Sequence, residues 1–250
     1  MTSLSAPVPP VPSDVPPGSV AWLRANVARF SNGPDHVRRR GLAVSLLASV
    51  GELRDEAFAR TQGIVAALGE FDVMAEVARP VPVGVLASAL GLPGVSADVA
   101  LVAAAYHPHV TPGAAAEAAL GRLIAACGGA DERAAARIGL LVQACDATAG
   151  LIGNELSAWL SGKPAGPAVL STRRRIDGAD VSVSLAGTPF GAGPRACPGE
   201  RHATALATGV LRALQGFRLT EVRTSWVSSP NLRMPEQLWV TRGRAGNGLC

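Results

Sequence analysis

The chain has 250 residues, of which 48% are hydrophobic and only 17% charged, and its formal net charge is +4. The positive charge is gathered in short arginine runs and only 4% of the residues are aromatic, whereas nucleic-acid-binding domains usually carry a broad basic face with interleaved aromatic side chains. No stretch reaches the ~20 uninterrupted apolar residues of a membrane span. The composition therefore argues against a nucleic-acid partner and against a membrane protein.

The mean hydropathy of the chain, +0.25, is high for a protein whose whole surface faces water. We therefore expect a cofactor, a partner or a second copy to cover part of the apolar surface, and we predict a homodimer. The N-terminus lacks the basic-then-apolar layout of a secretory signal, and the four cysteines are scattered without the spacing of a disulfide framework. These features predict a protein of the reducing cytoplasm.

In chain order, residues 1–17 contain six prolines, which predicts a polyproline-like, disordered lead-in that buries no core. From Gly18 the pattern is helical, beginning with "SVAWLRANVARF" and continuing through residues 33–68, 71–93 and 113–126. The longest helical pattern covers residues 131–161. At ~1.5 Å per residue this helix would span about 45 Å, and a helix so long and so apolar has to run through the core.

After Gly162 the pattern changes from helical to β. Residues 168–175 and 179–187 are typical of short strands, a glycine-rich loop follows them, and a helix is expected from Gly199 to Leu214. Two further strand-like stretches, "FRLTEV" and "EQLWVT", come last. We therefore predict one mainly α-helical domain over residues 18–241 with a small β region near its C-terminal end, followed by a flexible tail over residues 242–250.

The glycine-rich loop, "PFGAGPRACPGE" from Pro189 to Glu200, fits more than one kind of site. Gly191 to Ala196 match the G-x-G-x-x-G/A turn of dinucleotide-binding proteins, and Glu221 lies at roughly the distance of the acid that binds the ribose. However, this turn belongs at the start of a βαβ unit, and too little chain follows it here. Cys197 and His202 could bind zinc, but no second pair of ligands has the required spacing.

A third possibility is a heme whose iron is bound by a thiolate. Cys197 would be the axial ligand, and the N-terminus of the helix that begins at Gly199 would help to keep its sulfur ionised. The loop glycines, Gly193 among them, would let backbone N–H groups approach the sulfur. Phe190 could cover one side of the sulfur, and Arg195 could pair with a heme propionate.

The ten residues from Phe190 to Gly199, "FGAGPRACPG", match every fixed position of the heme-binding signature of the cytochromes P450. The chain resembles this family, in the family's order, from about Gly18 to Thr241. The resemblance implies a reduced cytochrome P450-like fold, mainly α with a small β region. It also implies a b-type heme, activation of O2, a small-molecule substrate and an electron-donating partner such as a ferredoxin.

Two helical stretches carry the rest of the resemblance. "NGPDHVRRR" resembles the segment leading into the family's C helix, where His36 and Arg40, at i and i+4 on one face, match the pair that binds the heme propionates. "VQACDATAGLIGNEL" resembles the long I helix, which implies that Ala144, Asp146 and Thr148 line the distal face and that Asp146 and Thr148 are the catalytic residues. The family's acid–alcohol pair would fall at Asp146 and residue 147, but residue 147 is alanine, and Thr148 lies about 100° further round the helix.

The chain also departs from the family. Members are normally far longer, and the stretch between the long helix and the cysteine contains no Glu-x-x-Arg pair. In the family that pair lies on the K helix and helps to fasten the cysteine loop, so we expect the K helix and the meander to be missing. One of Arg173 to Arg175 is expected to replace the family's β-strand arginine on a propionate, and Arg175 fits best because of its distance to Asp180.

Two functions follow from this resemblance. The first is a shortened P450-like oxidoreductase of the monooxygenase type, which holds heme b on Cys197 and acts on a small organic molecule, with an acidic ferredoxin docking on the basic side near Arg195. The second is a P450-derived protein without monooxygenase activity, acting as a heme-binding or heme-free scaffold or as a catalyst of a non-oxidative step. Ala147 and the missing Glu-x-x-Arg pair favour the second function, whereas the intact cysteine loop favours the first.

Overall fold

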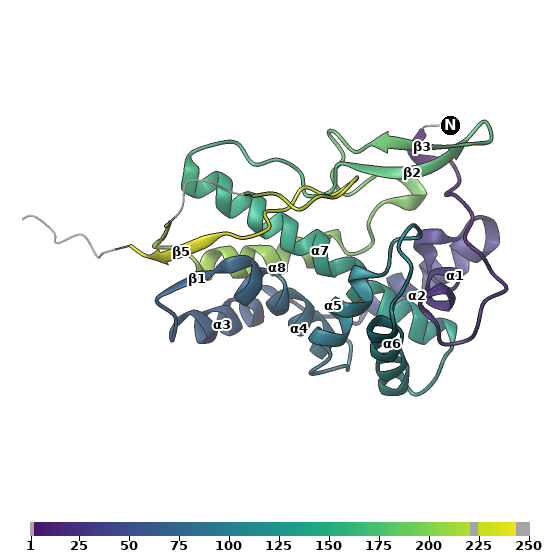
Figure 1. Cartoon of the computed structure of the whole chain (residues 1–250), viewed down its shortest axis with the longest axis horizontal. Helices are drawn as coiled ribbons and strands as arrows, with labels where there is room; N and C mark the ends of the chain where they lie inside the picture. The colour runs from purple at the N-terminus through teal and green to yellow at the C-terminus, as the bar shows by residue number, and fades with distance from the viewer. Residues whose placement is uncertain (1–2, 221–224, 244–250) are drawn as a thin grey trace, which may run out of the picture.

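The computed structural model describes residues 3–220 and 225–243. In these residues the α-helices are α1 (Val20–Ala25), α2 (Gly33–Ala48), α3 (Arg54–Val65), α4 (Pro80–Ala89), α5 (Ser96–Ala104), α6 (Ala114–Cys127), α7 (Glu132–Ser161) and α8 (Glu200–Ala213). The strands are β1 (Glu70–Asp72), β2 (Ser171–Ile176), β3 (Ala179–Ser184), β4 (Phe217–Leu219) and β5 (Trp239–Arg242). Short helical turns are η1 (Ser3–Ser5), η2 (Ala28–Phe30), η3 (Met74–Ala78, a π-helix) and η4 (Gly193–Arg195). In Figure 1, α7 crosses the middle of the molecule, with α3 and α4 below it and β2 and β3 above it.

Helix α7 is the long core helix expected from the sequence. Its start is capped by Asp131, whose carboxylate accepts the N–H of Ala134 at 2.6 Å, and it ends at Gly162 in the left-handed conformation. Buried side chains recur along α7 from Ala134 to Leu156, and Ile138 and Leu156 are fully buried. Within the described residues, α7 is the one helix long and apolar enough to cross a membrane by length and composition, but most of its apolar stretch is buried inside the protein.

The strands form two small antiparallel sheets. One has the order β1-β5-β4, with Val240 of β5 opposite both Phe71 and Leu219. The other is the β2–β3 hairpin, which turns at Asp177 and Gly178, both with positive φ, as two-residue hairpin loops require. The sheets confirm a small β region within a mainly helical fold.

Helix α8 packs against α3 at very short range. Gly209 of α8 faces α3 so closely that an added Cβ would meet the carbonyl oxygen of Arg54 and would lie 3.0 Å from the Cβ of Ala57. Only glycine permits this approach. Because α8 begins directly after the cysteine loop, this contact with α3 fixes where the loop joins the helical core.

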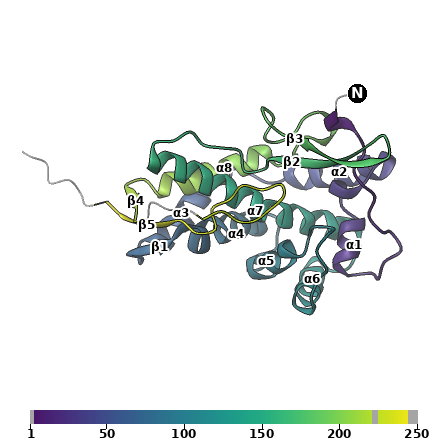
Figure 2. The ribbon, with the colours of Figure 1, turned by 45° about the horizontal axis from the view of Figure 1, so that its top comes forward.

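Residues 3 to 8, which we expected to be part of a disordered lead-in, instead lie against the β2–β3 hairpin and the start of α2. Val8 is buried, and its backbone N–H and C=O both pair with the side-chain amide of Asn32, at 2.9 Å each. The N–H of Arg175 donates to the carbonyl of Pro7 at 2.7 Å. Figures 1 and 2 both show the N-terminal segment beside β2 and β3. At the other end, Arg242 of the expected tail belongs to β5, and residues 244–250 lie outside the described residues.

Candidate functional site

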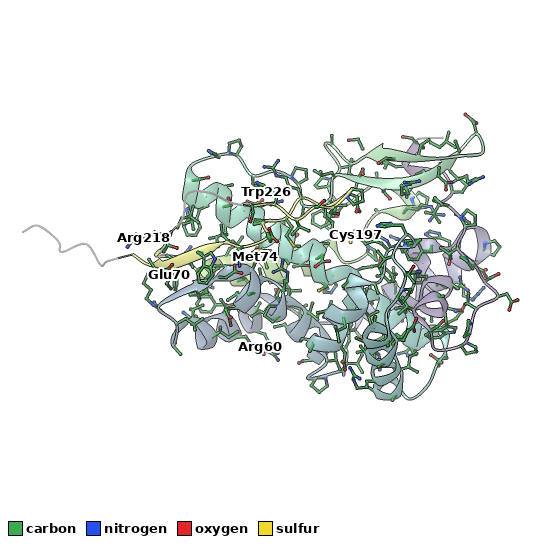
Figure 3. The ribbon with its side chains drawn as sticks, in the orientation of Figure 1. Arg60, Glu70, Met74, Cys197, Arg218 and Trp226 are labelled. Atoms are coloured by element: carbon green, nitrogen blue, oxygen red, sulfur yellow. The ribbon has the colours of Figure 1, made fainter. Side chains whose placement is uncertain are left out.

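The loop between β3 and α8 is closed by its own hydrogen bonds. Cys197, labelled in Figure 3, lies near the end of this loop, and its N–H donates to the carbonyl of Phe190 at 2.7 Å. Gly191 and Gly193 have φ of +74° and +65°. The backbone of residues with a side chain rarely adopts these angles, so the two positions require glycine. The loop then passes through η4 and enters α8 after Gly199. The backbone therefore brings Phe190 and Cys197 together across seven residues of sequence.

Cys197 is exposed as a whole residue. The surrounding atoms nevertheless displace enough water to raise its pKa, while a hydrogen bond from the Gly199 N–H acts in the opposite direction. The N–H of Gly199 at the start of α8 therefore favours the thiolate, in the expected direction, but desolvation outweighs it. A positive charge beside the sulfur would favour the thiolate over the thiol.

Four basic side chains from three parts of the chain gather beside this loop: His36, Arg40, Arg174 and Arg195. We call them the cationic cluster. Desolvation lowers the pKa of His36 first, and the charges of Arg195, Arg40 and Arg174 lower it further. Desolvation and then Arg40 also lower the pKa of Arg195. The four groups are thus close enough to repel one another.

Arg174 and Arg195 of the cationic cluster donate their hydrogen bonds to neutral acceptors within the described residues. Arg195 Nη2 donates to the Ser31 carbonyl at 3.0 Å and to Asn32 Oδ1 at 2.7 Å. Arg174 donates to the Leu4 carbonyl at 3.0 Å and to the hydroxyl of Thr172 at 2.7 Å. No carboxylate in the described part of the chain forms an ion pair with any member of the cluster. Partly buried cations of this kind favour an anionic ligand.

The strand arginine of the cluster is Arg174 rather than the expected Arg175. Side chains alternate along β2, so neighbouring residues face opposite sides. Arg174 is buried, whereas Arg175 is exposed and forms an ion pair with Asp180 at 2.8 Å across the hairpin. The sequence separation from Asp180 therefore pointed to Arg175, which faces outward, and not to Arg174, which faces the cluster.

The three expected distal residues lie on α7, but they do not face the same way. Ala144 is partly buried and packs against the core. Asp146 and Thr148 are two residues apart, which separates them by roughly 200° around a helix. Thr148 is buried, whereas Asp146 faces Arg79: desolvation raises the pKa of its carboxyl, and Arg79 opposes that shift. Asp146 and Thr148 therefore do not form one proton-relay pair.

Arg79 was missed at the sequence level, although its spacing gave a signal. Glu76 and Arg79 form a Glu-x-x-Arg spacing outside the stretch where the family carries it. Glu76 is exposed on η3, and no ion pair joins these two residues within the described part of the chain. Arg79 instead contributes its charge beside Asp146 and Cys145 on α7.

The two other kinds of site find no support. Over residues 3–220 and 225–243, no group of three or more His, Cys, Asp or Glu side chains could hold a metal ion. After the loop, α8 leads into β4, which pairs antiparallel with β5 instead of completing a parallel βαβ unit. Glu221, the candidate ribose contact, lies outside the described residues.

No family model and no curated protein matches the sequence. Solved structures do match the fold, and several cytochromes P450 are among them. The enzyme CxnD, for C–S bond formation in chuangxinmycin biosynthesis, has a TM-score of 0.72 at 17% identity over 90% of this chain and 80% of its own. P450 RauA, complexed with a biosynthetic intermediate of aurachin RE, has a TM-score of 0.70 at 21% identity, and the match covers 88% of this chain and 79% of RauA. P450BioI, in complex with a fatty-acid-ligated acyl carrier protein, has a TM-score of 0.70 at 16% identity, and the match covers 93% of this chain and 87% of P450BioI.

Proposed function

Because the chain has the cytochrome P450 fold in a shorter form than is typical, we propose that it binds heme b through Cys197 and oxidises a small organic molecule in the cytoplasm. The observation that carries this proposal is the cationic cluster beside the cysteine loop. It combines four basic groups that lack a carboxylate partner among the described residues with an exposed cysteine. The cationic cluster would pair with the two propionates of a heme, and Cys197 would bind its iron as a thiolate.

The residues present fit this group. Cys197 would bind the iron, with the Gly199 N–H donating to the sulfur, and the cationic cluster would hold the propionates. When bound, a heme with a thiolate ligand supplies O2 activation. Because the pKa of the Cys197 thiol is raised, binding as a thiolate releases a proton, so the affinity for heme should increase with pH.

A second candidate function rests on α7. Ala147 stands where the family's alcohol would be, Thr148 is buried, and Asp146 lies on a different side of the helix from Thr148. Proton delivery from this helix is therefore incomplete. A heme-binding protein without monooxygenase activity accommodates this arrangement, and so does a catalyst of a non-oxidative step.

The substrate and partners follow from the same structural similarity. RauA and P450BioI were solved with a biosynthetic intermediate and with a fatty acid on its carrier protein, so we infer a small organic substrate for this chain. An acidic ferredoxin-type donor would match the basic surface near Arg195. Exposed apolar side chains such as Val37 (71% exposed) and Trp159 (51% exposed) favour a homodimer, which a light-scattering mass of one chain at micromolar concentration would contradict.

The test of heme ligation is the spectrum of the reduced protein under carbon monoxide. We expect the long-wavelength Soret band of a thiolate-ligated heme, its loss in Cys197→Ala, and its retention in Cys145→Ala, because Cys145 is buried on α7. A band typical of histidine ligation, or no heme band, would contradict the proposal. With a ferredoxin and its reductase present, formation of an oxygenated product separates monooxygenation from the second candidate function.

The propionate assignment has a matched pair of variants. Arg174→Ala should weaken heme binding roughly 10- to 100-fold, as expected for loss of one charge-assisted pair. Arg175→Ala, one residue away and paired with Asp180, should bind heme as the parent does. Equal effects of the two changes would remove the cationic cluster as the propionate site.

A further inference from the structure

The first residues of the described chain lie across the cationic cluster and reach the cysteine loop. We call residues 4–8 the N-terminal strap. The carbonyl of Leu4 accepts the Nε–H of Arg174 at 3.0 Å, and the carbonyl of Pro7 accepts the N–H of Arg175 at 2.7 Å. The strap therefore contacts β2 through one backbone hydrogen bond and one side-chain hydrogen bond.

Asn32, just before α2, joins the strap to the cysteine loop. Its amide oxygen accepts the Val8 N–H at 2.9 Å and an Arg195 Nη2–H at 2.7 Å, while its amide nitrogen donates to the Val8 carbonyl at 2.9 Å. Asn32 stands at the N-cap position of α2 but makes no side-chain capping bond. Its hydrogen bonds thus serve the strap and the loop rather than the helix.

A second contact joins the strap to the loop directly. Gly193, in the left-handed region at φ +65°, lies so near Ser5 that an added Cβ would be 3.4 Å from the serine hydroxyl oxygen. Gly193 and Arg195 belong to the same turn, η4, two residues before Cys197. The strap therefore contacts this turn at Gly193, and Asn32 holds its other end at Arg195.

We propose that the N-terminal strap and Asn32 are positioning elements that fasten the cysteine loop to the helical core. The stretch between α7 and the loop has no Glu-x-x-Arg pair to do so, and the loop's own hydrogen bonds, such as Cys197 N–H to Phe190, are local. The strap and Asn32 add a long-range connection to those made by Arg195 with the Ser31 carbonyl and by Gly209 of α8 with α3. The further consequence, that the strap slows the loss of heme, rests on the proposed function.

Hydrogen exchange of the protein without heme tests the fastening. The amides of Gly191, Ala196 and Cys197 are hydrogen-bonded within the loop and report its opening. In Asn32→Ala, which removes three hydrogen bonds, these amides should exchange roughly 10- to 100-fold faster, with α7 unchanged. The control Asn26→Ala also removes side-chain hydrogen bonds, to Trp22 and Arg39, but none to the strap, and should leave the loop unchanged.

The variant Val8→Gly tests the contribution of the strap alone, because it leaves the direct hydrogen bond between Asn32 and Arg195 in place. It removes the buried Val8 side chain and leaves every residue of the loop in place. Loop exchange should again become roughly tenfold faster. Unchanged loop exchange in both Asn32→Ala and Val8→Gly overturns the proposal, as does an equal increase along α7, since that would mean global loss of structure.

Heme transfer to excess apomyoglobin tests the consequence for the cofactor. Asn32→Ala and Val8→Gly should lose heme about tenfold faster than the Asn26→Ala control. Faster loop exchange in a protein that binds no heme would support the fastening and refute the proposed function. Heme binding with unchanged loop exchange would support the proposed function and refute the fastening.

Discussion

Gly209→Ala should destabilise the protein, because α8 cannot keep its present distance from α3. The new methyl group would meet the Arg54 carbonyl oxygen and would lie 3.0 Å from both the Phe58 amide nitrogen and the Ala57 Cβ. Backbone atoms cannot rotate away, so the helices have to separate. Overpacking costs about 1–3 kcal/mol, and we expect the upper end here. The ~1 kcal/mol gained by alanine over glycine in a helix offsets part of it.

The net loss of about 2 kcal/mol should lower the Tm by roughly 4–8 °C, measured by circular dichroism. Gly63→Ala on α3 is the matched control: nothing lies within 4 Å of an added Cβ there, so it should raise the Tm by roughly 1–4 °C. The shift of α8 should also displace Cys197 and weaken heme binding. A Gly209→Ala protein with an unchanged or higher Tm would refute the close-contact argument.

Three further predictions concern pH and charge. Desolvation lowers the pKa of His107 to about 4, so stability should fall as pH drops from 6.5 toward 4, by up to about 3 kcal/mol, and denaturant titrations of His107→Gln should lack this component. The bonds from Arg38 and Arg39 lower the pKa of Glu132 to about 2. Glu132→Gln should therefore lower the free energy of unfolding by about 1 kcal/mol at neutral pH and leave it almost unchanged near pH 2. An equal loss of stability at the two pH values would contradict the pairing of Glu132 with Arg38 and Arg39. The pKa of Asp146 is raised, so Asp146→Asn should be more stable than the parent at neutral pH, with the difference vanishing in acid; a less stable variant at neutral pH would show that the carboxylate is not penalised by burial.

The sequence was sufficient where local rules decide the structure. Asp131 and Gly162 bound α7 as capping residues do, and Asp177-Gly178 turns the hairpin as expected of such a pair. The cysteine loop could be recognised because its family signature is ten contiguous residues, and two of its glycines adopt backbone conformations that other residues avoid. Each of these signals is contained within a few neighbouring residues.

The sequence was insufficient where a partner comes from far along the chain. Which of three consecutive arginines faces inward depends on the register of β2 against β3, and Arg175 was favoured only because it forms a surface ion pair. The strap could not be predicted for the same reason. Six prolines predict disorder, and the partners that order the strap, Asn32 and β2, come from later in the sequence. The orientation of Asp146 became clear only with Arg79 beside it.

The bond from Arg174 to Leu4 spans 170 residues of sequence, and this separation sets an order of assembly during synthesis. At about 5–20 residues per second, the ribosome adds Leu4 to the chain roughly 10–30 s before it adds Arg174. During that interval the first segment of the nascent chain has no strand edge to pair with. The strap can therefore take up its position beside the cysteine loop only after β2 has been synthesised.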